Sequence, residues 1–116
     1  MTGGRFCPFI FKYGAYYYLL VPHYTYVSDY SEIEIYRDSN PTFYFGGREY
    51  LGVVKKPGAS GWDSADQDTP CILTDDIFRN TFEAAAGKLW LYYSGDAGPA
   101  PNGNKWGEGL LIADDI

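Results

Sequence analysis

The sequence predicts an all-β chain made of two up-and-down antiparallel sheets, and three observations favour this class. One pattern occurs twice: an apolar strand after a Pro, a turn, and an aromatic strand, first within 7–21 and again within 69–94. Phe, Trp and Tyr make up 19% of the chain, and aromatic residues favour strands. Fourteen Gly and seven Pro divide the chain into short segments, as the turns of an all-β protein do.

The first unit is expected to hold four strands. The first strand follows Pro8, and a tight turn at 13–15 leads into the aromatic second strand. The third strand alternates Ile33 and Ile35 with charged residues, which is the period of two of a half-buried strand. A polar turn at 38–41 and a Gly-containing loop precede the fourth strand. The expected strands span 8–12, 16–22, 32–37 and 49–54.

The second unit repeats the order with three strands, expected at 70–74, 88–94 and 106–113. Its connection at 75–87 is longer than a hairpin needs. We expect a single unit over 1–116, with a first sheet at about 6–54, a linker at 55–67 and an incomplete second sheet at about 68–116. Repeated sheets of this kind form β-propeller blades. A small β-sandwich is the alternative fold.

Two blades cannot close a ring, and each isolated blade leaves an apolar face uncovered. Either the natural chain is therefore longer, or several copies associate into a homo-oligomer. The net charge of −6, with no basic cluster larger than Lys55-Lys56, argues against nucleic acid as a partner. No apolar run approaches the roughly 20 residues of a membrane span, so no membrane partner is expected. Residues 1–5 lack the features of a signal peptide, and the compartment stays unassigned.

The two cysteines, Cys7 and Cys71, lie beside the Pro of each repeat. They form neither a CxxC pair nor a set with His, so no metal site and no cofactor are predicted. A disulfide between them is geometrically conceivable, but buried free thiols are the default expectation.

Four segments carry a resemblance to a known family. They read PFIFKYGAYYYL at 8–19, WDSADQDTPCIL at 62–73, LWLYYSG at 89–95 and WGEGL at 106–110. In this order they resemble the blade-opening motifs of the five-bladed β-propeller carbohydrate enzymes, the glycoside hydrolases of family 43 and their relatives in families 32, 62, 68 and 130. The resemblance covers nearly the whole chain and implies two blades of a five-bladed ring.

The resemblance also implies where catalytic carboxylates belong, at the start of the first strand of a blade. Cys7 and Thr69 occupy two such positions, and a thiol is a poor substitute for a carboxylate base because it is mostly protonated at neutral pH. Asp68, next to Thr69, and Glu108 are the remaining catalytic candidates. The set of carboxylates is incomplete, so the resemblance leaves open whether this chain is an enzyme.

Up-and-down topology predicts a ligand-binding edge that holds the start of the first strand, the end of the second, the start of the third and the end of the fourth. Trp62, Asp63, His23, Tyr24 and Glu32 are expected at this edge. Trp62 is suited to stack on a sugar ring, and Asp63 to accept hydrogen bonds from hydroxyls. Simpler interpretations stay open: packing for Trp62, a solvated turn for Asp63, an exposed loop for His23, and a structural role for Glu32 and Glu108, which the repeat aligns.

Three functions are compatible with these patterns. The first is a glycoside-hydrolase-like propeller fragment that acts on or binds a polysaccharide or oligosaccharide and is not catalytically complete by itself. The alternative is a non-catalytic sugar-binding module that completes its ring by homo-oligomerisation. The third is an interaction fragment without a ligand.

Overall fold

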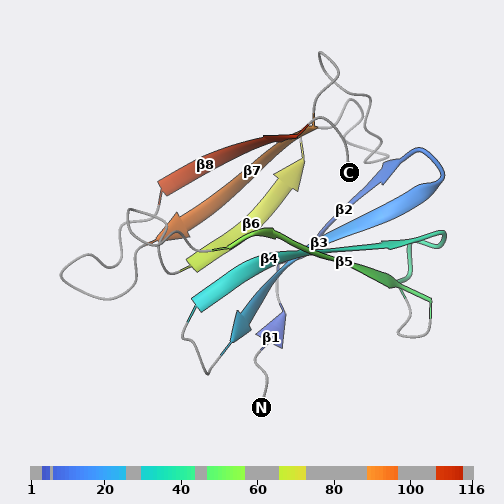
Figure 1. Cartoon of the computed structure of the whole chain (residues 1–116), viewed down its shortest axis with the longest axis horizontal. Helices are drawn as coiled ribbons and strands as arrows, with labels where there is room; N and C mark the ends of the chain where they lie inside the picture. The colour runs from blue at the N-terminus through green and yellow to red at the C-terminus, as the bar shows by residue number, and fades with distance from the viewer. Residues whose placement is uncertain are drawn as a thin grey trace.

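The computed structural model describes residues 4–5, 7–25, 30–43, 47–56, 66–72, 89–96 and 107–113. Every regular element in these ranges is a β-strand, and the strands form two antiparallel sheets (Figure 1). This confirms the predicted fold class. The first sheet contains β1 (Gly4–Arg5), β2 (Phe9–Tyr13), β3 (Tyr16–Thr25), β4 (Tyr30–Asp38) and β5 (Glu49–Lys55), and the second contains β6 (Asp66–Ile72), β7 (Leu89–Asp96) and β8 (Gly107–Ala113).

The first sheet has up-and-down connectivity around β3. On one side β3 pairs with both β1 and β2, which lie end to end and act as one interrupted strand. On the other side β3 pairs with β4, and β4 pairs with β5. Tyr13 pairs with Tyr16 across a two-residue turn, where Gly14 adopts φ +61°, a conformation that glycine reaches without strain.

The main core lies between the two sheets. Phe11, Leu20 and Ile33 are almost completely buried there, and the Phe11 ring stacks on Tyr18 at a centroid distance of 5.4 Å. The second sheet contributes Ile72, Leu89, Leu91 and Tyr93 to the same cluster. Because side chains alternate across a strand, these residues are the inward-facing half of each strand.

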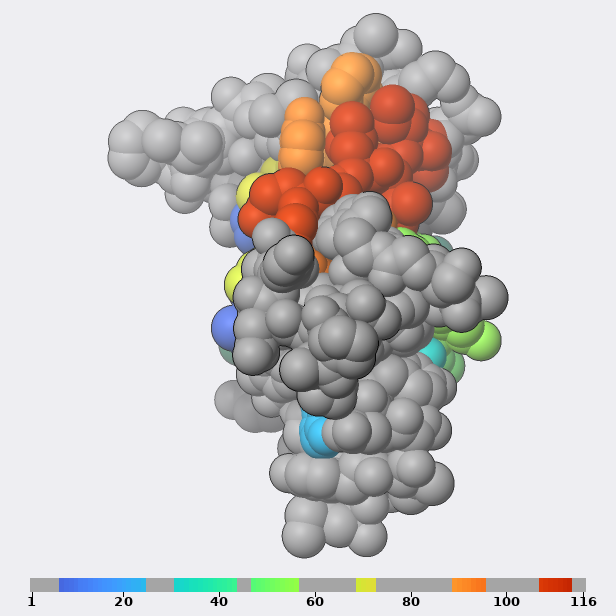
Figure 2. Space-filling model, turned by 90° about the vertical axis from the view of Figure 1, so that its left-hand side faces the viewer, coloured from blue at the N-terminus to red at the C-terminus, as the bar shows by residue number. Residues whose placement is uncertain are grey.

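The outward face of the first sheet is also apolar. Val21, Tyr36 and Phe43 are buried on it, and Ile10, Tyr17 and Leu19 pack against them. The outward face of the second sheet differs, since its apolar side chains reach solvent: Tyr92 and Leu110 are each 40% exposed and Ile112 is 52% exposed. Residues of β8 are visible at the surface beside β7 (Figure 2).

Several predictions fall outside the described residues. The long connection at 75–87 and most of the linker, 57–65, belong to this group. The division of the chain into one unit with a linker remains a prediction. Within the described ranges, the structure has no helix with the length and hydropathy needed to cross a membrane.

Candidate functional site

The predicted ligand edge is the edge at which β3 and β7 end and β4, β6 and β8 begin. Figure 1 shows these strand ends on one side of the molecule, and we call this the site edge. Two of the predicted residues meet there, because His23 on β3 pairs with Glu32 on β4. In the second sheet, Ser94 on β7 pairs with Asp68 on β6 and with Glu108 on β8. The two catalytic candidates therefore flank the same serine.

A β-bulge interrupts the first strand of each sheet at the site edge. In the second sheet the pairing shifts by one residue between Asp68 and Cys71. In the first sheet Arg5 pairs with His23 and Phe9 with Leu20, so one extra residue lies between the two pairs. Bulges of this kind bend a strand and redirect one side chain, and they are frequent next to active sites.

Cys7 and Thr69 occupy equivalent positions in the two bulges. Each precedes the Pro of its repeat, and each has φ +45°. This left-handed conformation is unfavourable for residues other than glycine, so it costs free energy in both sheets. The Thr69 hydroxyl is hydrogen-bonded to the Ser94 hydroxyl, whereas Cys7 is exposed. The bulges thus present a thiol and a hydroxyl where the resemblance places carboxylates.

Both cysteines carry free thiols, as expected, but both residues are exposed, so the expectation that they are buried is wrong. The Cys71 thiol is nevertheless partly shielded from solvent. Partial burial raises the pKa of the Cys71 thiol above its ordinary value, because desolvation penalises the thiolate. Cys71 is therefore a weak nucleophile at neutral pH.

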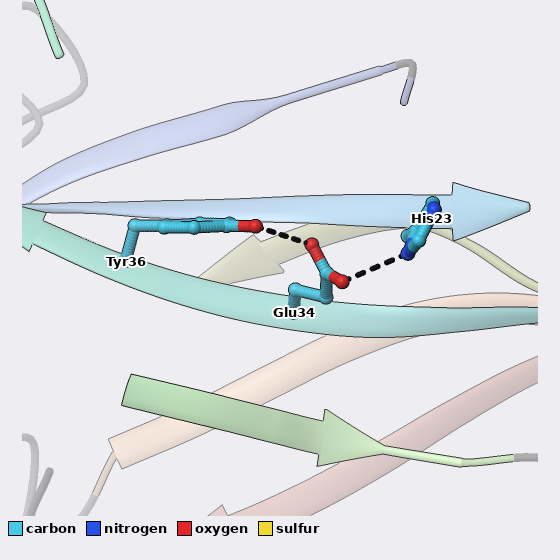
Figure 3. A network of polar contacts seen from close by, with 3 residues as sticks. All are labelled: His23, Glu34 and Tyr36. Carbon is cyan, nitrogen blue, oxygen red and sulfur yellow. Dashed lines mark hydrogen bonds and ion pairs between the residues drawn. The ribbon is translucent and has the colours of Figure 1, made fainter. Parts of the chain in front are cut away.

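A buried polar network lies on the outward face of the first sheet, at the site edge (Figure 3). The Glu34 carboxylate accepts a hydrogen bond from the Tyr36 hydroxyl at 2.7 Å and contacts Nδ1 of His23 at 2.8 Å. The side chains of His23 and Glu34 are only 13% and 6% exposed. A carboxylate buried to this degree needs such partners, because an unpaired buried charge is costly.

Glu32 lies beside this network. One ligand atom from each of His23, Glu32 and Glu34 lies within 4.8 Å of the other two. An imidazole and two carboxylates make a set of donors that divalent metal ions accept.

The other predicted residues are placed as follows. Tyr24 is half-buried on β3 and pairs with Ser31. Glu108 is exposed on β8, and Asp68 lies on β6. Trp62 and Asp63 fall outside the described residues, so their role in binding stays a prediction.

One alignment made from the sequence needs correction. The two sheets can be aligned on their bulges. Three residues that pair across the first sheet then correspond to three that pair across the second: Phe9, Leu20 and Ile35 match Cys71, Tyr92 and Leu110. Glu108, two residues before Leu110, then corresponds to Ile33 and not to Glu32. The two glutamates therefore lie on faces of their sheets that do not correspond.

Sequence reasoning passed over Glu34, Tyr36 and Ser94. The period of two that predicted β4 already puts Glu34 and Tyr36 on the face of Glu32. A hairpin register for β3 and β4 would have placed that face opposite His23. For Ser94, no signal distinguishes it from any other serine near the end of a strand.

Comparison with known proteins gives a structural likeness without a sequence family. No family model and no curated protein matches the chain. Two solved structures are similar over 99% of this chain, one described as a glycoside hydrolase and the other as a BT0996 RGII complex. Each has a TM-score of 0.77 at 18% identity, and the chain spans 34% of the length of each. The likeness supports a glycoside-hydrolase-like fold and does not select one of the families named above.

Proposed function

We propose that this chain is part of a carbohydrate-active β-propeller protein and that its site edge binds a saccharide. The observation that carries the proposal is the likeness to a solved glycoside hydrolase over 99% of the chain. The chain matches only 34% of that protein, which agrees with a unit of two blades that belongs to a larger ring. Families 43, 32, 62, 68 and 130 stay the families that the motifs resemble.

The second sheet offers groups suited to sugar hydroxyls. The hydroxyls of Thr69 and Ser94 both donate and accept hydrogen bonds, and the Glu108 carboxylate accepts them. Register fixes Asp68 and Glu108 on either side of Ser94, and each neighbouring pair of Cα atoms in such a ladder is about 5 Å apart. Glu108 is exposed, so it is accessible to a ligand. His23, Tyr24, Glu32, Trp62 and Asp63 are the further ligand-binding candidates.

Catalysis by the isolated chain is not part of the proposal. Both bulge positions hold residues without a carboxylate, Cys7 and Thr69. A glycosidase needs a carboxylate pair at a defined separation across the scissile bond. The complete protein would have to provide the missing members from other blades.

The proposal is tested by measuring saccharide binding to the purified chain. A glycan array first selects a ligand, and isothermal titration calorimetry then gives its affinity. Glu108→Gln should weaken binding at least about tenfold, since a hydrogen bond to a charged group contributes about 1.5–3 kcal/mol. Ser94→Ala should weaken it about twofold to tenfold, since a hydrogen bond between neutral groups contributes about 0.5–1.5 kcal/mol. Glu49→Gln is the matched control, because Glu49 is an exposed carboxylate paired with Arg37 at the opposite edge of the first sheet. Equal affinities in all variants would show that the saccharide does not bind at the site edge. Absence of binding on the array would reject the proposal that the chain binds a saccharide.

The open face of the second sheet favours a second candidate, a module that homo-oligomerises. Tyr92, Leu110 and Ile112 are exposed on it, and contiguous exposed apolar groups usually mark an interface. Light scattering after size exclusion measures the mass directly. A trimer of two-blade chains supports this candidate, and a monomer at micromolar concentration rejects it.

A further inference from the structure

The outer edge of β8 lacks the features that protect the other sheet edges, and we propose that it pairs antiparallel with β8 of a second copy of this chain. In the described part of the chain the two sheets end at four edges: the interrupted strand of β1 and β2, then β5, β6 and β8 (Figure 1). An open edge presents unpaired N–H and C=O groups, so natural sheets protect it with features such as Pro, Lys or a bulge. The proposal does not depend on saccharide binding.

Three of the four edges are protected in this way. Pro8 and a bulge interrupt the edge formed by β1 and β2, and Pro70 and a bulge interrupt β6. On β5, Leu51 and Val54 are extra residues, since β4 pairs with the residues on either side of each of them, and the strand ends at Lys55. Each of these edges is therefore a poor template for a further strand.

The strand β8 is regular and apolar by comparison. It pairs with β7 along its whole length without a register shift, and its sequence, GEGLLIA, contains no Pro, Lys or Arg. Leu110 and Ile112 are exposed on it. In the first sheet the equivalent edge is occupied, because β4, which the bulge alignment matches to β8, pairs with β5 on its outer side. The repeat thus shows that a further antiparallel strand fits at this position.

The sequence of β8 is suited to pair with itself. In an antiparallel arrangement centred on Leu111, each Leu111 lies opposite Leu111 of the second copy, and each Leu110 lies opposite Ile112. Directly opposite side chains share one face of a sheet and contact each other, so both exposed side chains gain an apolar neighbour. The paired run 109–113 contains no charged residue. It therefore offers no group that would select a charged partner strand, whereas a second copy matches it with apolar residues throughout.

A cavity between the two sheets lies at the same edge. It has a volume of about 580 Å³, and Leu51, Val54, Leu111 and Ile112 are among the residues that line it. Leu51, Val54 and Ile112 are exposed, so the cavity opens to solvent beside β5 and β8. Leu111 packs against the core between the sheets. Leu111 of the second copy would lie on the same face of the extended sheet and would cover this opening.

The test is the mass of the purified chain, measured by analytical ultracentrifugation across the micromolar range. We expect a reversible dimer with twice the monomer mass of 13.0 kDa. Ile112→Lys should weaken association at least about tenfold, because each copy loses a buried apolar side chain and gains a charge at the pairing edge. Tyr92→Lys is the matched control, since it makes the same change at an exposed residue of the neighbouring strand β7, and it should dimerise as the parent does.

A crosslink identifies the strands that pair without relying on an introduced charge. In a protein with Cys7→Ser and Cys71→Ser, Leu111→Cys should form an intermolecular disulfide when an oxidant is added. Opposite Cα atoms in an antiparallel pair are about 4.5–5.5 Å apart, which is within the range of a disulfide. Tyr92→Cys in the same background should stay reduced.

Three results would overturn the proposal. The first is a monomer across the whole concentration range. The second is an oligomer that Tyr92→Lys weakens and Ile112→Lys does not, since the open face of the second sheet would then form the contact. The third is a disulfide at Tyr92→Cys and none at Leu111→Cys. Circular dichroism spectra that match that of the parent confirm that each variant is folded.

Discussion

Gly109 on β8 provides the sharpest test of how the second sheet packs. It pairs with Tyr93 on β7, and the Tyr93 ring lies directly over it. A Cβ atom added at this position would lie 2.3 Å from Cζ of Tyr93, whereas ordinary contact begins at 3.4 Å. Gly109→Ala therefore forces the ring to move by about 1.1 Å, the difference between these two distances.

The ring has little room for that movement. Tyr93 is 5% exposed and belongs to the core between the sheets. Overpacking in such a core costs about 1–3 kcal/mol, and the size of this clash puts the cost at about 2–3 kcal/mol. An unfolding entropy of about 2.1 cal/mol/K per residue gives about 0.24 kcal/mol/K for 116 residues. The expected fall in Tm is then about 8–12 °C.

Thermal unfolding followed by circular dichroism measures this change. Glu108→Ala is the matched control, because it introduces alanine at the neighbouring exposed position and should alter stability by at most about 0.5 kcal/mol. A double-mutant cycle with Tyr93→Leu isolates the clash and should show a coupling above about 1 kcal/mol. If Gly109→Ala melts within about 2 °C of the parent, the shift for about 0.5 kcal/mol, then the packing of Tyr93 over Gly109 is wrong.

Three further predictions concern single sites. Ile33→Ala, at a side chain with no exposed surface, should cost about 2–5 kcal/mol and lower the urea midpoint; a cost below about 1 kcal/mol would contradict its place in the core. Cys7→Gly should raise the free energy of unfolding by about 0.5–1 kcal/mol in the same assay. Glycine removes the strain of the left-handed backbone at φ +45°, and this gain exceeds the cost of the greater conformational entropy that glycine gives the unfolded chain. A lower stability would contradict this prediction. The raised pKa of Cys71 should move the midpoint of its alkylation rate above about pH 8.5, the ordinary value for a thiol; measured in a Cys7→Ser protein, a midpoint at or below about 8.5 would refute it.

Much of the fold could be predicted because its signals are local. The period of two around Ile33 and Ile35 marks β4, and the Pro that opens each repeat marks the first strand of each sheet. The end of β3 was harder to predict. A Pro normally ends a central strand because it lacks an N–H group, yet β3 continues through Pro22 to Thr25. Pro22 lies between the residues that pair with β1 and β2, opposite the bulge, where the pairing with these two strands is interrupted.

The candidate site was less predictable because it depends on register. A bulge adds one residue, and a shift of one residue moves a side chain to the other face of a sheet. That is why the sequence repeat aligned Glu108 with Glu32, while the structure aligns it with Ile33. The contact between His23 and Glu34 likewise joins two strands and appears in neither strand alone. The meeting of His23 and Glu32 at one edge, by contrast, follows from topology and is seen in the structure.

The matched bulges at Cys7 and Thr69 make this chain a natural scaffold for installing new chemistry. The two positions have the same backbone conformation, φ +45° before a Pro, and they already carry different side chains. The fold therefore tolerates different side chains at this point. The backbone would fix the direction of the Cα–Cβ bond of an aspartate introduced at either position, and the main chain would not need to change. The repeat thus keeps the backbone conformation constant while the side chain differs. The side chain at one of the two positions can be changed while the other position serves as the internal control.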